Sequence, residues 1–243
     1  MTVYAVGDIH GQLGMLEDAL AKIETDSGSD APVVFLGDLV DRGPDSRGVI
    51  DLLSRGVAEG RNWTVLKGNH DRMFSYFLRP QPIVETQILV GMDWFHPRIG
   101  GVGTLASYGV EVPDGARYYH FLPESLAAVP QTHIDFMNAL PSHHHVGDLL
   151  FVHAGLRPGV ALQDQTEDDK IWIRSEFHDH TDPWPWLVVH GHTPVKTPRH
   201  YGNRVNLDSG AGYDRPMTTA VFEGRDCFVL TEKGRARLLP TNS

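Results

Sequence analysis

The chain has 243 residues, of which 41% are hydrophobic and 21% charged, and its formal net charge is −10. This length suits one large α/β domain or two small ones. The negative charge argues against non-specific binding to nucleic acid, and no apolar run approaches the roughly 20 residues of a membrane span.

The single cysteine, Cys227, excludes an internal disulfide and a cysteine zinc site. One cysteine suits a reducing compartment, so we expect a cytoplasmic protein. The net charge and the lack of a long apolar run lead us to expect neither a nucleic-acid nor a membrane partner. We also expect no signal peptide, because strand-like sequence begins at Val3 without a basic stretch before it.

The first third alternates short apolar runs with helical patterns. Apolar runs at 3–6, 33–36 and 62–66 predict buried strands. Helices are predicted from apolar spacing at 13–23, at 46–57 with Asp45 as N-cap, and around 73–78, ending before Pro80. Alternating strands and helices are typical of an α/β fold.

Residues 80–147 have a weaker pattern, with scattered proline, glycine and aromatic residues. We predict one helix from Glu85 and another from Glu124 to Leu140, within an insert that borders the functional site. The run from His143 to His145 is interpreted as a solvated polar loop. Nothing here suggests a domain boundary, so we predict a single domain over residues 1–243.

Regular signals return after this region. Apolar runs at 149–152 and 187–189 predict two more strands, and residues 195–239 look like antiparallel strands and hairpins. Trp184 and Trp186, next to prolines, are predicted to serve packing.

Each of the five apolar runs in the body of the chain ends within a few residues in a candidate metal ligand or catalytic group. Active sites of α/β sheets gather at the carboxyl ends of strands, so these side chains are expected to converge. The set is Asp8 and His10, then Asp38, then Asn69 and His70, then His153, then His192.

Oxygen and imidazole ligands without a thiolate predict two divalent metal ions, manganese first, with iron or zinc as alternatives. Asp38, with two carboxylate oxygens, is the natural bridge between ions roughly 3.5–4 Å apart. Close by, Asp41 and Arg42 are predicted to orient a catalytic group and to hold a phosphate.

Three ordered motifs carry a resemblance to a known family: Gly7-Asp8-Ile9-His10-Gly11, Gly37-Asp38-Leu39-Val40-Asp41-Arg42-Gly43 and Gly68-Asn69-His70-Asp71. They resemble the signature blocks of PPP-type Ser/Thr phosphatases, within the calcineurin-like metallophosphoesterases. The resemblance continues at residues 153–155 and 191–193, and the stretch 153–177 is similar to prokaryotic members. It implies a two-sheet β-sandwich flanked by helices, in α/β/β/α layers.

By this resemblance, Asp8, His10 and Asp38 would hold one metal ion. Asp38, Asn69, His153 and His192 would hold the other. Pro194 stands where the wider superfamily often has a second histidine, which, together with Arg42, favours the PPP branch.

The chemistry expected of these parts is attack on phosphorus by a hydroxide that bridges the metals. His70 would act as general acid, with Asp41 holding it in place. Arg42 and a second arginine would bind the phosphoryl oxygens; we choose Arg174, with Arg157 as its rival. Asp208 could support the site but is more readily explained as a turn residue.

We therefore predict a metal-dependent phosphoesterase that acts on phosphomonoesters, most simply as a Ser/Thr phosphoprotein phosphatase. A symmetrical dinucleoside tetraphosphate hydrolase and a small-molecule phosphatase are the alternatives, so the substrate is a phosphoprotein or a small phosphoester. A non-catalytic scaffold of the same fold is a remote alternative, because a scaffold has no need to keep ligands, acid and arginine together.

Overall fold

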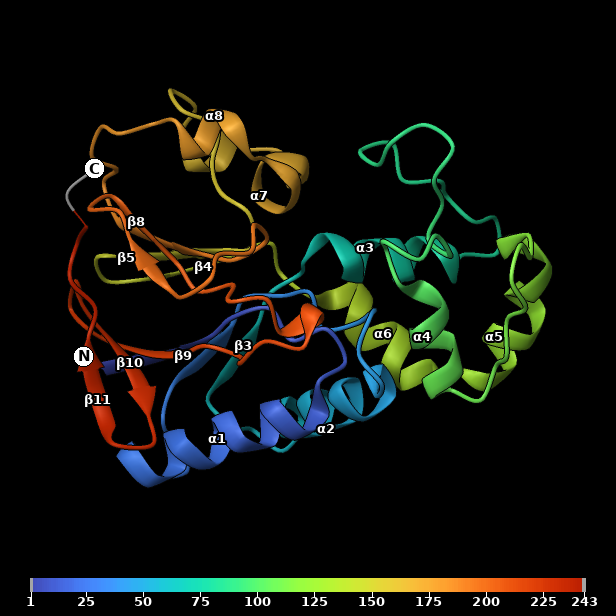
Figure 1. Ribbon diagram of the computed structural model, residues 1–243, viewed down its shortest axis with the longest axis horizontal. Coiled ribbons are helices and arrows are strands. Elements are labelled where there is room, and N and C mark those ends of the chain that lie inside the picture. Colours follow the sequence, from blue (N-terminus) through green and yellow to red (C-terminus); the bar gives the residue numbers. More distant parts are fainter. Residues whose placement is uncertain (1, 242–243) are drawn as a thin grey trace.

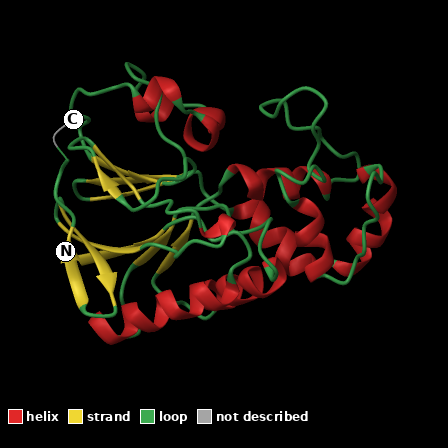
Figure 2. Cartoon of the chain, viewed as in Figure 1, coloured by secondary structure: helices red, strands yellow, loops and turns green. Residues whose placement is uncertain are grey.

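The computed structural model describes residues 2–241, and within them the strands form two sheets that pack face to face (Figures 1 and 2). The six-stranded sheet has the order β11-β10-β9-β1-β2-β3. In it, β1, β2 and β3 are parallel, and β9 runs antiparallel to β1. Its strands are β1 (Thr2–Val6), β2 (Val33–Phe35), β3 (Trp63–Val65), β9 (Thr219–Glu223), β10 (Asp226–Thr231) and β11 (Gly234–Arg237).

The second sheet has the order β4-β5-β6-β8-β7. Its central strands β5, β6 and β8 are parallel, and β4 and β7 are antiparallel edges. Its strands are β4 (His143–Val146), β5 (Leu149–Val152), β6 (Leu187–His190), β7 (Arg199–His200) and β8 (Arg204–Asn206).

Successive side chains of a strand point to opposite faces of the sheet, so the buried residues form separate clusters on the two faces. Val3 and Ala5 of β1 point between the sheets and pack in one cluster with Phe151 of β5 and Val189 of β6. The intervening Tyr4 belongs to the cluster on the outer face. The inter-sheet core therefore fixes the distance between the two sets of strand ends.

Helices cover both outer faces. Below the six-stranded sheet in Figure 1 lie α1 (Leu13–Ser27) and α2 (Ser46–Ala58), whose Leu16 and Ile50 are fully buried against it. The other sheet is covered by α7 (Glu167–Trp172) and α8 (Ser175–His178), where Phe177 and Trp184 are buried. The predicted order of helix, sheet, sheet, helix is confirmed, as is the packing role of Trp184.

The structure corrects the predicted helices of residues 80–147. No helix begins at Glu85; its buried carboxylate pairs with Arg72 of α3 (Asn69–Phe77), and this pairing holds the segment in turns. The single helix from Glu124 to Leu140 is two helices, α5 (Leu122–Ala128) and α6 (Gln131–Ala139). Pro130 separates them because it lacks an amide hydrogen and forces the preceding residue into extended backbone.

Two further predictions need correction. The histidine run at 143–145 forms edge strand β4 rather than a loop, because its backbone pairs with β5. The region after residue 195 is not wholly antiparallel, since β8 pairs in parallel with β6. Between α3 and α5 the chain also forms α4 (Gly101–Ser107), which the sequence pattern did not predict.

Among the residues described, no helix combines the length and the apolar character that crossing a membrane would require.

Arg235 of β11 connects the terminal hairpin to α1. Its contacts allow a prediction about the stability of the fold. Its guanidinium donates to the Asp26 carboxylate at 2.7 Å and pairs with Glu223. The hydrogen bond from Arg235 lowers the pKa of Asp26. A lowered pKa stabilises the fold above the ordinary carboxyl pKa of about 3.9, and this contribution is lost as the pH falls through the folded-state pKa.

We expect Arg235→Ala to lower the free energy of unfolding by about 1 kcal/mol or less at neutral pH, since partly exposed ion pairs contribute little. Urea titrations should show the difference from the wild type shrinking below about pH 4. Lys233→Ala on the same hairpin makes the same charge change and serves as the control. An equal loss of stability in both variants would argue against the Asp26 contact.

Candidate active site

The predicted ligands meet where the strands of both sheets end, and all of them are buried. Asp8 and His10 follow β1, Asp38 follows β2, His153 follows β5 and His192 follows β6. Asn69 and His70 open α3, just after β3. None of these side chains is more than 5% exposed. The structure thus brings the whole predicted set together.

Asp38 lies at the centre, with one carboxylate oxygen directed to each of two groups. Its Oδ2 is 3.5 Å from His10 Nε2, and its Oδ1 is 3.4 Å from His153 Nε2. Within the described residues, two groups of potential metal donors share Asp38: one adds His10 and His70, the other adds His153 and His192. This is the position that a bridging ligand needs.

Asn69 contributes an oxygen to the second group. Its Oδ1 is 3.0 Å from His153 Nε2 and 2.8 Å from His192 Nδ1. Asp8 lies beside this group, since its carboxylate accepts the backbone amide of His192 at 3.1 Å. A Cβ on Gly191 would be 1.9 Å from Asp8 Oδ1, so only glycine allows this close approach.

The histidines are arranged to present lone pairs. Nδ1 of His10 donates to the carbonyl of Val40, and Nδ1 of His153 donates to that of Leu36, both at 2.9 Å. These bonds place the hydrogen of each ring on Nδ1, so that Nε2 presents a lone pair towards the cluster. Burial lowers the pKa of His10, His153 and His192, which favours the neutral imidazole that metal binding requires.

The carboxyl groups around Asp38 repel one another. Burial, together with the charges of Asp208 and Asp38, raises the pKa of Asp8 well above its usual range. Burial also raises the pKa of Asp71 to about 8 and that of Asp208 to about 6. Closely buried carboxylates beside neutral imidazoles are stabilised by cations, so the donor set fits divalent metal ions.

Backbone conformation marks the same residues. Among the residues described, six other than glycine have positive φ, and five of them were predicted as site residues. Such conformations cost about 1–3 kcal/mol each and persist where the surrounding structure imposes them. The five are His10, Asp38, Asp41, Arg42 and His192, with φ of 49°, 51°, 73°, 69° and 67°.

His70 and Asp41 form a hydrogen-bonded pair. His70 Nδ1 is 2.6 Å from Asp41 Oδ2. Two residues that sequence reasoning missed complete the arrangement: the Trp94 indole donates to the same oxygen at 3.0 Å, and the Thr104 hydroxyl donates to Asp41 Oδ1 at 2.7 Å. Trp94 is 53 positions from Asp41, and no local motif signals the contact.

Two arginines face this cluster without a carboxylate partner. Arg42 contacts Nε2 of His10 at 2.7 Å and Nε2 of His70 at 3.0 Å. Arg174 donates to the Thr193 hydroxyl at 3.1 Å. Neither has a carboxylate within 4.0 Å among the residues described. The rival Arg157 is already paired, with Asp169 and with Glu176.

Asp208 combines both roles considered for it. It is a turn residue, accepting the amide of Gly210 at 2.9 Å, and it is close enough to Asp8 to raise that group's pKa.

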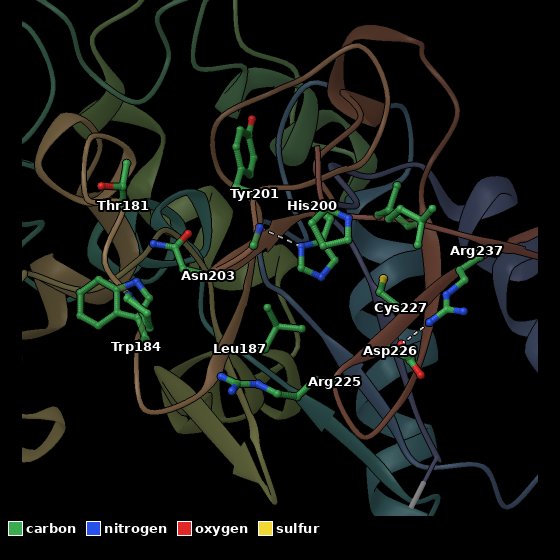
Figure 3. Close-up of a pocket in the computed structure, with 15 residues that line it drawn as sticks. Thr181, Trp184, Leu187, His200, Tyr201, Asn203, Arg225, Asp226, Cys227 and Arg237 are labelled. Atoms are coloured by element: carbon green, nitrogen blue, oxygen red, sulfur yellow. Dashed lines mark hydrogen bonds and ion pairs between the residues drawn. The ribbon is translucent and has the colours of Figure 1, made fainter. Parts of the chain in front are cut away.

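A separate cavity of about 510 Å³ lies at the opposite end of β6, beside Leu187 and Cys227 (Figure 3). None of the predicted site residues is among the described residues that line it.

A comparison with protein families matches residues 1–216 to the model described as calcineurin-like phosphoesterase. Two curated relatives have the name bis(5′-nucleosyl)-tetraphosphatase PrpE [asymmetrical]. The protein from Oceanobacillus iheyensis is 25% identical, with 93% of this chain and 90% of the relative covered. The protein from Halalkalibacterium halodurans is 28% identical, with 89% of this chain and 88% of the relative covered.

Solved structures show the same fold. A crystal structure of a candidate diadenosine tetraphosphatase is 24% identical with a TM-score of 0.63, covering 98% of this chain and 94% of that one. A cold-active protein-tyrosine phosphatase from a psychrophilic Shewanella is 14% identical with a TM-score of 0.59, covering 98% and 80%. These likenesses establish the architecture of two mixed sheets flanked by helices.

The geometry of Asp38 predicts that Asp38→Asn weakens metal binding at both groups at once. An amide lacks the negative charge, so we expect affinity for Mn²⁺ to fall by at least about tenfold. After gel filtration, mass spectrometry measures the number of metal ions bound per protein. Circular dichroism checks that the variant is folded. Asp30→Asn, at an exposed position, is the control. Retention of two tightly bound ions by Asp38→Asn would refute the bridging role.

Proposed function

The chain belongs to the calcineurin-like phosphoesterase family, and from that membership we propose that it hydrolyses dinucleoside tetraphosphates by an asymmetrical cut. Such a cut yields a nucleoside triphosphate and a nucleoside monophosphate. The observation that supports this substrate is the name shared by relatives that are 25–28% identical and match about nine-tenths of both chains. The Ser/Thr phosphoprotein favoured by the sequence stays a prediction, and the substrate test includes it.

The proposed metal ligands are Asp8, His10 and Asp38 for one ion, and Asp38, Asn69, His153 and His192 for the other. When bound, two divalent cations, for which we propose Mn²⁺, make water nucleophilic near neutral pH and polarise the phosphoryl group. The protein contributes buried, preoriented donors, which need little rearrangement to hold the ions.

Arg42 and Arg174 are proposed to bind the phosphoryl oxygens. Each is a guanidinium with no competing carboxylate within 4.0 Å among the described residues. The Cζ of Arg42 lies over the ring of Tyr213, 4.9 Å from the ring centroid, and its Nη atoms contact the Nε2 atoms of His10 and His70. A planar guanidinium held this way suits two parallel hydrogen bonds to a phosphate.

His70 is proposed as the general acid. A water oxygen forms a new bond to phosphorus and releases a proton to solvent, while the bond from phosphorus to the bridging oxygen breaks. The His70 imidazolium gives its Nε2 proton to the departing oxygen and later regains one from solvent. Asp41 accepts the hydrogen on Nδ1 at 2.6 Å, and Nε2 faces the Arg42 guanidinium at 3.0 Å, beside the proposed phosphoryl position. Trp94 and Thr104 hold Asp41 in turn.

The substrate test compares kcat/KM for diadenosine tetraphosphate with values for Ser/Thr and Tyr phosphopeptides, all with Mn²⁺. We expect a preference for the dinucleotide of about 10²-fold, equivalent to about 2.7 kcal/mol of transition-state binding. Chromatography of the products then identifies the cut: ATP with AMP is the expected pair.

Two equivalents of ADP would indicate the symmetrical cut instead. A preference for a phosphopeptide would contradict the dinucleotide proposal and support a protein phosphatase instead. The Asp38→Asn protein, assayed in parallel, removes any contribution from a contaminating hydrolase.

The acid assignment predicts a dependence on the leaving group. His70→Asn should slow hydrolysis of an alkyl phosphate by about 10²–10⁴-fold, because an alkoxide needs the proton most. It should slow hydrolysis of the dinucleotide and of p-nitrophenyl phosphate less, because those leaving groups are weaker bases. Trp94→Phe removes the indole donor to Asp41 and keeps an aromatic ring in the packing, so the same pattern should appear in a weaker form.

Kinetics across leaving groups of graded basicity make this measurement, and Trp186→Phe, outside the site, is the control. A uniform loss for every leaving group in His70→Asn would contradict the acid role. A uniform loss in Trp94→Phe alone would reduce Trp94 to a packing residue.

A further inference from the structure

Asp214 is the one residue with positive φ, other than glycine, that was not predicted as a site residue among the residues described; its φ is 57°. It directly follows the short 3₁₀ turn η3 (Ala211–Tyr213), the small orange helix at the centre of Figure 1. Strained backbone persists where the surrounding structure imposes it, and it gathers at functional sites. The strain therefore directs attention to the turn that ends at Tyr213.

This turn rests against the candidate active site. A Cβ on Gly212 would be 2.5 Å from Cδ2 of His10 and 3.1 Å from Cδ of Arg42. Only glycine lets the backbone come this close. On the other side, the Gln12 side chain donates to the carbonyl of Ala211 at 3.2 Å. The turn is thus held beside residues proposed to bind metal and phosphate.

Tyr213 presents an aromatic ring at the surface beside the site. The residue is 54% exposed, and Cζ of Arg42 lies over its ring at 4.9 Å from the centroid. The same guanidinium contacts Nε2 of His10 and Nε2 of His70, so the ring is on the side of His70 from which the proton would be transferred. Burial lowers the pKa of Arg174, and Tyr213 is among the nearby acidic groups that oppose this shift.

The ring is held in place before a ligand binds. The amide of Tyr213 donates to the carbonyl of Gly210 at 2.9 Å, and the amide of Asp214 donates to that of Ala211 at 3.1 Å. A tyrosine side chain has only two rotatable bonds to order, and the contact with Arg42 restricts them further. A ligand that stacks on this ring therefore loses little affinity to ordering it.

The position of Tyr213 suits the base of a nucleotide substrate. With the attacked phosphoryl group between Arg42 and Arg174, the groups attached to phosphorus extend past a ring that contacts the first arginine and is near the second. The guanidinium covers one face, and the exposed part of the ring can stack on any base, since every base has a π-face. We propose that Tyr213 is the stacking platform for a nucleobase of the dinucleotide, an inference that rests on the proposed function.

The test removes the ring with Tyr213→Leu. Selectivity is measured as kcat/KM for diadenosine tetraphosphate divided by kcat/KM for ethyl phosphate, which has no ring. We expect this ratio to fall by about tenfold, because stacking on an aromatic side chain contributes about this much per base. Tyr213→Phe keeps the ring and should retain the ratio.

The matched control is Tyr201→Leu. The ring of Tyr201 also lies against an arginine, with Cζ of Arg204 at 4.0 Å from its centroid, but it lines the separate cavity at the opposite end of β6. Its removal should leave the selectivity ratio unchanged. Circular dichroism checks that each variant is folded.

A second measurement does not depend on dinucleotide turnover. AMP and ribose 5-phosphate are compared as inhibitors of p-nitrophenyl phosphate hydrolysis, because both have a phosphate on a ribose but only AMP has a base. The inhibition constant of AMP for the wild type should be about tenfold lower than that of ribose 5-phosphate. Tyr213→Leu should abolish this difference, and Tyr213→Phe should keep it.

The two measurements separate the proposals. A wild type that fails to hydrolyse the dinucleotide sinks the proposed function, and the inhibition pair then decides the platform alone. Equal inhibition by AMP and ribose 5-phosphate in the wild type would overturn the platform. An equal loss for both substrates in Tyr213→Leu would also overturn it, because the ring would then act only by supporting Arg42. Loss of selectivity in Tyr213→Phe as large as in Tyr213→Leu would overturn stacking and assign the contact to the hydroxyl group.

Discussion

The rest of the structure depends on a carboxylate buried between two sheets. Asp38 is 2% exposed, and its two oxygens point to histidines that follow strands of different sheets, His10 after β1 and His153 after β5. A buried charge in this position is costly without compensating cations. The two sheets must therefore be held at a fixed separation, which is what the shared apolar core between them provides.

Strain at the strand ends follows from the same constraint. Five candidate site residues adopt positive φ, a cost of about 1–3 kcal/mol each that local sequence alone would not sustain. The turns are fastened to one another: the amides of Ile9 and His10 donate to the Asp38 carbonyl, and Asp71 accepts the amides of Leu39 and Gly68. Each strained turn thus forms hydrogen bonds with a neighbouring turn. These bonds hold the site residues in place before any ligand binds.

The sequence predicted the ligand cluster because every member stands at the end of an apolar run, where parallel strands bring residues together. It could not predict Trp94, whose contact with Asp41 depends on how residues 80–100 fold over the site. The prediction of a helix at Glu85 was wrong for a similar reason, a contact between residues that are distant in the fold's local pattern. A helical pattern was overridden by the buried ion pair with Arg72, a tertiary contact with no local trace. The motifs name only residues proposed to meet the metal ions and the phosphoryl group, which explains why they left the rest of the substrate open.

The irregular segment supports the catalytic pair. Trp94 and Thr104 donate hydrogen bonds to the Asp41 carboxylate, which lies 2.6 Å from His70 Nδ1. Under the proposed function, the residues at the strand ends serve the metal ions and the phosphoryl group, which are common to all phosphate esters. Substitutions at Trp94 or Thr104 would therefore act on His70 through Asp41, without contacting the residues at the strand ends.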